Sequence, residues 1–490
     1  MPETPIAGPA DATAGKATLI RGIDYLLAYD AEAGTHRMMR DADMAFRGGR
    51  FVDPASLAAE DIGETIDGRG RMILPGFVDI HAHPGFETML KGLTEEVGSL
   101  KLQMSSLYEY LFLFDTTHAG MVAATQVALS ELMQSGVTTI CDISTPHAGW
   151  IDTLGASGMR AIAAPMFREA RWYTPNGHEV LYDWDEAAGE TRMAAALAEV
   201  DAALAHPSGR LSGMICPAQI DTCSREMFED ARDAARARGL KIQTHAAQSV
   251  VEFQEIMRRH GETPIGWLDK MGMLGEDMIV GHGIFLDHND WLGWPERRDI
   301  GLLAESGTSV AHCPTVFVRR GIALQDVGKY VREGVNVGIG TDTYPHNFIE
   351  EMRNGIYAAR VSAHDVRAAN VEIMIHAATL GGAKALGRDD LGRIAPGAKA
   401  DFFTVDLDDP SMRPVFDPLR SLVYSAGDRP VRDVYVDGAR VVKDGTALAF
   451  DMDDALTRLE AAQKASVAEV HKYDWAGRPA ETLMPPAFGA

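Results

Sequence analysis

Two histidines one residue apart, His81 and His83, end an apolar stretch that reads ILPGFVDIHAHPG over residues 73–85. Successive side chains of a β-strand point to opposite faces, so histidines at positions i and i+2 project to the same side. Two such imidazoles suit two ligands of one zinc ion, with Zn–N distances of about 2.0–2.1 Å. The pair alone is a weak signal, because a single histidine is more often an ordinary core or surface residue.

Other apolar runs of the chain also end in or next to a polar side chain that can do chemistry. These side chains are His245, His282, His312 and Asp342. Three imidazoles and one carboxylate, from His81, His83, His245 and Asp342, would leave a coordination position for water, as a catalytic metal site requires. The set is a much stronger signal than any one of its members.

The elements that must position these residues are short runs rich in Val, Ile and Ala, which alternate with helical patterns. Continuous apolar strands separated by helices favour a parallel sheet that is covered on both faces. Eight such runs predict an α/β fold, a (β/α)8 TIM barrel whose functional residues lie at the C-terminal strand ends. The runs span residues 77–81, 137–142, 160–165, 213–218, 240–245, 278–282, 308–313 and 336–342.

The two flanks of the expected barrel have a different composition, rich in turns and in strand-forming residues. Residues 16–73 and 393–450 each hold too few strands for a sheet alone, so we expect them to pair into one small β-sandwich-like domain. The barrel would then span residues 74–392. Residues 451–490 are expected to form a C-terminal helix and tail.

Charge and cysteine content exclude several classes of protein. The 490-residue chain carries a formal net charge of −24, which disfavours nucleic acids and anionic membranes as partners. Four cysteines without a CxxC pair are too few for a disulfide framework and indicate reduced thiols. The N-terminal residues contain no basic segment followed by an apolar one, so no signal peptide is expected. We therefore expect a cytoplasmic protein that acts on a small molecule.

Several longer motifs, taken together, resemble the amidohydrolase superfamily. They are LPGFVDIHAHPGFETMLKGL, THAAQ, GHGIFLDHNDWLGW, GIGTDTYP and the segment ATLGGAKALGRDDLGRIAPGAKADFFTVDL. The resemblance covers residues from about 16 to 450 and is greatest to the branch of cytosine deaminases, triazine hydrolases (chlorohydrolase-like enzymes) and adenosine-type deaminases. Members of this branch are often homo-oligomers, so we expect a homo-oligomer here.

The resemblance implies a role for each residue of the set. His81, His83, His245 and Asp342 would be metal ligands, and Asp342 would also take a proton from the metal-bound water. His282 would hydrogen-bond that water and polarise it. The strand at residues 213–218 lacks the lysine that bridges two metals in binuclear members, which favours one divalent ion. Zinc is the default, and iron, manganese or cobalt also suit such a nitrogen and oxygen site.

The chain departs from this pattern at Gln248, where deaminases of the branch usually carry a glutamate that protonates a ring nitrogen. A primary amide can only hydrogen-bond. In the alternative interpretation, Gln248 orients a heterocycle while another residue supplies the proton. The protein would then be an aminohydrolase or dechlorinase of a triazine, pyrimidine or purine derivative. Our first hypothesis is that the substrate needs no ring protonation. The metal-bound hydroxide would then attack the carbonyl of an amide, urea or carbamate.

Further side chains near the expected strand ends are candidates for the substrate pocket. Val316 and Phe317 stand where related deaminases have small polar residues, which indicates an apolar wall. Arg319 and Arg320 are expected at the surface. The residues predicted to contact substrate are His147, Trp150, Arg171, Trp172, His312, Phe317 and Tyr344.

Overall fold

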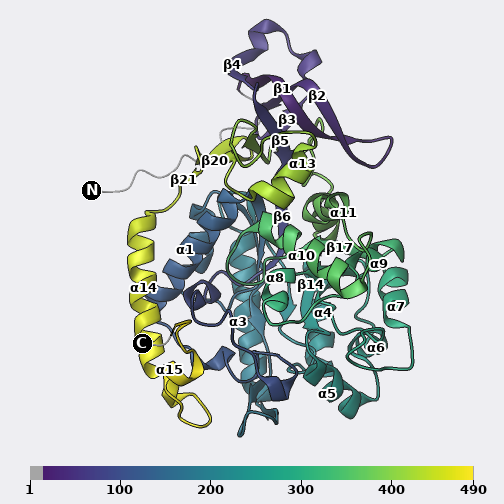
Figure 1. Cartoon of the computed structure of the whole chain (residues 1–490), viewed down its shortest axis with the longest axis vertical. Coiled ribbons are helices and arrows are strands. Elements are labelled where there is room, and N and C mark those ends of the chain that lie inside the picture. Colours follow the sequence, from purple (N-terminus) through teal and green to yellow (C-terminus); the bar gives the residue numbers. More distant parts are fainter. Residues whose placement is uncertain (1–14, 489–490) are drawn as a thin grey trace.

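The computed structural model describes residues 15–488, and its largest part is a parallel β-barrel wrapped by helices (Figure 1). One half of the barrel is the parallel sheet β12-β8-β7-β6, and the other half is β14-β15-β16-β17. Backbone bridges join the halves, between Ile215 and Ile242 on one side and between Ala82 and Asp342 on the other. The (β/α)8 barrel predicted from the sequence is therefore confirmed. Its strands are β6 (Phe77–Ala82), β7 (Val137–Asp142), β8 (Arg160–Ala163), β12 (Leu211–Gly213), β14 (Ile242–Ala246), β15 (Met278–His282), β16 (Ser309–His312) and β17 (Asn336–Ile339).

The barrel strands are buried on both faces, which explains their continuous apolar sequences. Every residue of β6, FVDIHA, is buried, and Asp79 and His81 are its polar members. Asp79 accepts hydrogen bonds from the backbone N–H of His81 and from the hydroxyl of Thr341, the latter at 2.6 Å. These bonds satisfy a buried carboxyl group and tie the first strand to the chain that leaves the last one.

The helices around the barrel start at side-chain caps and end where the chain turns back toward the next strand. The helix α4 begins after Ser224, whose hydroxyl accepts a hydrogen bond from the Met227 N–H, and it ends at Gly239 with φ +64°. Only glycine adopts that left-handed conformation at little cost. The outer helices include α1 (His118–Gln134), α2 (Trp150–Ala156), α3 (Glu186–Leu204), α4 (Arg225–Arg238), α5 (Val250–His260), α7 (Asp299–Ser306), α9 (Val327–Arg332), α10 (Phe348–Ala363) and α11 (Val371–His376).

Segments from both ends of the chain form a second, nine-stranded sheet, drawn at the top of Figure 1. The N-terminal strand β5 pairs antiparallel with the C-terminal strand β18, and Leu74 faces Phe403 in that register. Phe46, Phe402 and Tyr435 stack in the core of the sheet. Its strands are β1 (Ala17–Asp30), β2 (Thr35–Arg47), β3 (Arg50–Val52), β4 (Ile62–Asp67), β5 (Arg71–Pro75), β18 (Phe402–Asp406), β19 (Val431–Val436), β20 (Ala439–Lys443) and β21 (Thr446–Ala447).

A buried arginine connects the barrel to this sheet. Arg160, the first residue of β8, donates hydrogen bonds to Asp401 at 3.1 Å and to Asp437 at 2.8 Å. The Arg160 side chain is 3% exposed and that of Asp401 is 2% exposed, so this ion pair is shielded from water.

The last long helix, α14 (Met452–Glu469), packs along α1, as Figure 1 shows at the edge of the molecule. The chain after it reaches the segment that covers the mouth of the barrel, where Arg478 and Trp475 both donate hydrogen bonds to Glu109. Within residues 15–488, none of the helices combines the length and the apolarity needed to span a bilayer.

Candidate metal centre

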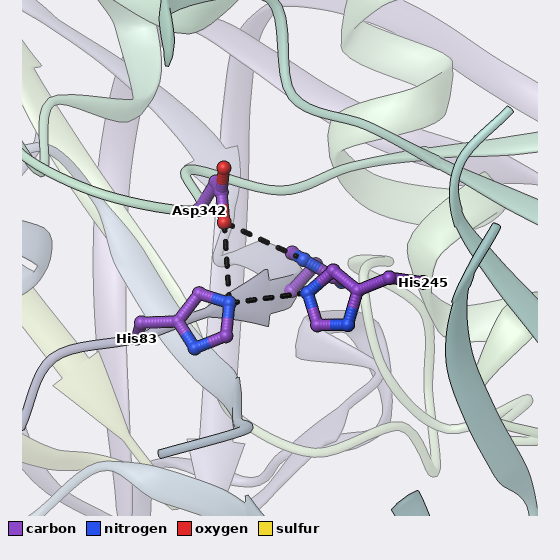
Figure 2. Close-up of side chains that lie close together, drawn as sticks. His83, His245 and Asp342 are labelled. Atoms are coloured by element: carbon purple, nitrogen blue, oxygen red, sulfur yellow. Dashed lines mark hydrogen bonds and ion pairs between the residues drawn. The ribbon is translucent and has the colours of Figure 1, made fainter. Parts of the chain in front are cut away.

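Four side chains from three strand ends converge inside the mouth of the barrel. His81 and His83 come from β6 and the residue that follows it, His245 from β14, and Asp342 from the loop after β17. The His83 Nε2 atom lies 3.3 Å from His245 Nε2 and 3.3 Å from Asp342 Oδ1, as Figure 2 shows. One potential ligand atom of each of the four residues lies within 4.8 Å of the others. The geometry could therefore hold one metal ion.

The backbone fixes Asp342 against the two histidines of β6. The Asp342 N–H donates to His81 O at 2.8 Å, and the His83 N–H donates to Asp342 O at 2.7 Å. Asp342 has φ +59°, a left-handed conformation that aspartate tolerates better than most residues. This turn directs the carboxylate toward the imidazoles instead of along the strand.

Hydrogen bonds on the far side of two rings leave their Nε2 atoms facing inward. His245 Nδ1 lies 2.6 Å from the carbonyl oxygen of Ala218, and His81 Nδ1 contacts the side-chain oxygen of Gln243. His81 Nε2 is buried and has no hydrogen-bond partner among the described residues. A buried nitrogen without a partner is costly, and a bound cation would satisfy it.

The charges at the centre match the donor set of a divalent cation. Burial, together with His81 and His83, lowers the pKa of His245 well below its usual value. Burial lowers the pKa of His282 to about 3 although Asp342 opposes the effect. Burial alone would raise the pKa of Asp342, but His282, His81 and His83 hold it well below its usual value. Burial would lower the pKa of His83, but Asp342 raises it above its usual value. Imidazole nitrogens beside an ionised carboxylate are the donors that zinc and similar ions bind.

A second group, His81, His282 and Cys313, also lies within 4.8 Å, but its chemistry fits a metal less well. Burial raises the pKa of the Cys313 thiol well above its usual value, and only the thiolate is a good ligand. The His282 ring packs edge-on against His81 at 4.6 Å and against Phe317 at 4.7 Å. His282 thus stands beside the four-residue set.

A cavity of about 420 Å³ opens in front of the centre. His83, His245, His282 and Asp342 lie at its floor, and Gln248 lies beside them. Most of its wall is apolar, which is typical of a small-molecule site with a few placed polar groups. The aromatic residues of the wall are Phe86, Tyr110, Phe112, Phe114 and Phe317.

Of the residues expected to contact substrate, Phe317 lines this cavity and the others lie outside its lining. Trp150 and Trp172 are buried behind the strands, where their indole N–H groups donate to Asp142 and Asp221. Their apolar rings are buried in the core, which explains why these two side chains point away from the cavity. The remaining expected residues outside the lining are His147, Arg171, His312 and Tyr344.

The structure adds cavity residues that sequence reasoning did not identify. The segment 105–116 forms the roof and carries three of the aromatic side chains. Glu87, Arg319 and Arg320 line the wall, so the expectation that the two arginines lie at the surface was wrong. Arg319 and Arg320 follow the C-terminal end of β16, and the rule that barrel function gathers at that rim could have indicated them. No comparable signal pointed to residues 105–116.

Comparison with known proteins assigns the chain to a family. The model of the amidohydrolase family matches residues 72–441. The chain belongs to the amidohydrolase family. It is a hydrolytic enzyme that acts on carbon–nitrogen bonds.

Curated relatives match this family member over almost their whole length. The 5'-deoxyadenosine deaminase of Methanosarcina mazei is 27% identical over 454 residues, which cover 91% of this chain and 98% of the relative. The 5-methylthioadenosine/S-adenosylhomocysteine deaminase of Haloarcula marismortui is 29% identical over 423 residues, which cover 85% and 91%.

Solved structures of the same fold include zinc-containing proteins. A variant of the atrazine chlorohydrolase of Arthrobacter aurescens, solved with zinc and atraton, superimposes with a TM-score of 0.75 at 21% identity, covering 91% of this chain and 100% of that one. An adenosine deaminase from Xanthomonas campestris with bound zinc gives a TM-score of 0.74 at 22% identity, covering 92% and 98%.

Proposed function

We propose that this amidohydrolase is a metal-dependent aminohydrolase that removes an amino group from a planar N-heterocycle. The convergence of His81, His83, His245 and Asp342 at the floor of an aromatic-walled cavity carries the proposal. Flat aromatic walls suit a flat substrate, because aromatic rings gain most from offset-stacked or edge-on contacts. The full-length match to deaminases of adenine nucleosides supports the same substrate class.

The four converging residues would hold one divalent ion, and we propose zinc. Their donor set, three imidazole nitrogens and a carboxylate oxygen, fits zinc, and the orphaned Nε2 of His81 faces the shared centre. Iron, manganese or cobalt would fit the same set. When bound, the ion lowers the pKa of a water molecule and so supplies a nucleophile at neutral pH.

The side chains of the chain itself would orient the reactants and move protons. Asp342 is ionised and can accept a proton from water and return it to the departing nitrogen. His282 is neutral at neutral pH, so one ring nitrogen can donate a hydrogen bond and the other can accept one. The apolar wall at Phe317 excludes water from the reacting carbon.

Gln248 favours a second candidate function, the hydrolysis of an amide, urea or carbamate. Its Nε2 is buried without a partner among the described residues and can donate a hydrogen bond to a substrate, but it cannot transfer a proton. Burial raises the pKa of nearby Glu252 well above its usual value, and this acid does not line the cavity. A carbonyl substrate needs only the hydrogen bond, whereas a heterocycle needs a proton from elsewhere.

A product screen by mass spectrometry separates the two candidates. The metal-loaded enzyme is offered aminopyrimidines, aminotriazines and purine nucleosides in one panel, and anilides, phenylureas and carbamates in the other. Ammonia release from a ring amine is the expected result. Amine release from carbonyl substrates alone would support the second candidate and overturn the first. The variant Asp342→Asn serves as the blank for metal-catalysed hydrolysis in solution.

We further propose a cytoplasmic homo-oligomer with the domain boundaries 16–73, 74–392, 393–450 and 451–490. The four cysteines are buried free thiols, which suits a reducing compartment.

Exposed apolar side chains on α10 and the loop after it suit a subunit interface. They are Tyr357, Val361 and Val366. Sedimentation of the full chain measures its oligomeric state, and a monomer would contradict this part of the proposal.

A further inference from the structure

Two neighbouring arginines, Arg319 and Arg320, line the wall of the cavity close to the metal centre. Arg319 donates hydrogen bonds to the Tyr344 carbonyl oxygen and the Thr343 hydroxyl, both at 3.0 Å, which holds its guanidinium beside the loop that carries Asp342. Both side chains are half-buried. They are therefore fixed cationic groups within reach of a molecule that occupies the cavity.

Neither arginine has an anionic partner. No carboxylate among residues 15–488 lies within 4 Å of either guanidinium. Arg319 lies against the Tyr344 ring, 4.4 Å from its centroid, and Arg320 donates to the main-chain carbonyls of Val97 and Val316. In contrast, the fully buried Arg160 is paired with two aspartates. Charges removed from water are usually paired, and neither of these guanidinium groups is bonded directly to a carboxylate of the described residues.

Each guanidinium keeps N–H groups that no described residue uses. Arg319 Nε is buried and has no hydrogen-bond partner within the described chain. Arg320 Nη2 forms no hydrogen bond to residues 15–488, because its bonds to Val97 and Val316 use Nε and Nη1. Two adjacent guanidinium donors of this kind suit a carboxylate, which accepts several charge-assisted hydrogen bonds at once.

We propose that the substrate of this enzyme is a planar heterocycle that carries a carboxylate, and that Arg319 and Arg320 bind that carboxylate. The inference rests on the proposed function in one respect, namely that the substrate occupies this cavity. The aromatic wall would hold the ring, and the arginines would fix which ring carbon faces the metal centre. The two residues are thus determinants of specificity.

The charge balance of the cavity favours an anionic substrate. Its charged lining consists of three arginines and three acids, so the protein groups alone sum to zero. A divalent ion leaves an excess of positive charge, which one carboxylate offsets in part. The charged lining residues are Glu87, Asp115, Arg168, Arg319, Arg320 and Asp342.

Binding of matched carboxylates and carboxamides to the full-length, metal-loaded protein tests the proposal without turnover. Isothermal titration calorimetry compares benzoate with benzamide and nicotinate with nicotinamide, pairs that share a shape and differ in charge. We expect the carboxylates to bind at least about tenfold more tightly, as charge-assisted hydrogen bonds predict. The double variant Arg319→Gln/Arg320→Gln should reduce that ratio to roughly one.

Single variants and a control variant exclude other sources of the preference for carboxylates over carboxamides. If the double variant does not fold, Arg320→Gln alone should reduce the ratio at least about threefold, and Arg320→Lys should restore most of it. Arg367→Gln, at an exposed arginine that does not line the cavity, should leave the ratio unchanged.

Three outcomes would overturn the proposal. They are the absence of binding, equal affinities within each pair, and a preference that persists in the double variant with full metal content, which would assign the carboxylate to the metal. The product screen can fail while this binding preference holds, so the two proposals are tested separately.

Discussion

Asp342 combines two properties that a proton acceptor in a catalytic site needs. Its Oδ1 lies 3.5 Å from His81 Nε2 and 3.3 Å from His83 Nε2, so it faces the same point as the imidazoles. Its pKa is held well below the usual value by the surrounding histidines, although burial opposes this. The carboxylate is therefore ionised throughout the neutral range and available to accept a proton.

We predict that Asp342→Asn lowers kcat/KM by on the order of 10³-fold or more, because an amide cannot accept the proton. The rate is measured with the substrate that the product screen identifies. Circular dichroism should show an unchanged fold, and Asp365→Asn at an exposed ion pair should retain full activity. Near-native turnover in a folded Asp342→Asn enzyme would remove this role.

At the scale of one residue, sequence spacing predicted the centre better than the cavity wall. His81, His83, His245 and Asp342 stand at strand ends, and barrel geometry brings strand ends together. The wall depends on side chains such as Phe112 and Glu87, whose direction is set by segments without a regular period. Trp172 illustrates the limit, since its position near a strand end did not reveal that its ring packs into the core.

At the scale of the elements, neighbouring strands orient the groups of the centre. Gln243 on β14 contacts His81 Nδ1 through its side-chain oxygen and donates its Nε2–H to the Ile80 carbonyl oxygen at 3.0 Å. It therefore fixes both the tautomer and the direction of the His81 ring across the barrel.

We predict that Gln243→Leu weakens metal binding about 10- to 100-fold, which is the usual cost of losing a group that orients a ligand. Competition with a chromophoric chelator measures the affinity. Gln134→Leu, at a glutamine that hydrogen-bonds the Gly445 carbonyl on the outside of the barrel, is the matched control. An unchanged metal affinity in Gln243→Leu would show that the His81 ring needs no such support.

The first residue of α7, Asp299, carries a buried carboxyl group that links stability to pH. Burial and the nearby Asp287 raise the pKa of Asp299 from 3.8 to about 7. Between these pH values the folded chain holds a proton that the unfolded chain has lost, so the stability from this group falls as pH rises from 4 to 7.

Because Asn mimics the protonated acid, Asp299→Asn should become more stable relative to wild type over that interval, by up to about 4 kcal/mol. Thermal melts from pH 4 to pH 8 measure the difference. The difference in stability between Asp299→Asn and wild type should stay constant above pH 7. A difference that does not depend on pH would mean that Asp299 is ionised in the folded protein.

At the scale of the whole molecule, the Arg160 cluster is a deeply buried polar contact between the barrel and the nine-stranded sheet. We predict that Arg160→Met lowers the free energy of unfolding by about 3–5 kcal/mol, because it leaves Asp401 buried without its charged partner. Denaturant unfolding followed by tryptophan fluorescence measures the change. Arg69→Met, at an exposed pair with Asp67, should have almost no effect.

The eight barrel strands could be predicted from the sequence because each is a continuous apolar run bounded by helical patterns. The pairing of β5 with β18 could be expected only from the shortage of strands in each flank, since no local pattern states which distant strand is the partner. The Arg160 cluster could not be foreseen at all, because its members are far apart in the chain and none has a distinctive sequence context.

The metal content of the purified chain tests the central claim most directly. Elemental analysis of wild type, His245→Ala and the control His471→Ala, at a histidine that is exposed on the C-terminal segment, gives the number of ions per chain. We predict about one divalent ion per chain for wild type and the control, and a small fraction of that for His245→Ala. Full metal retention in a folded His245→Ala protein, or none in wild type, would contradict the account.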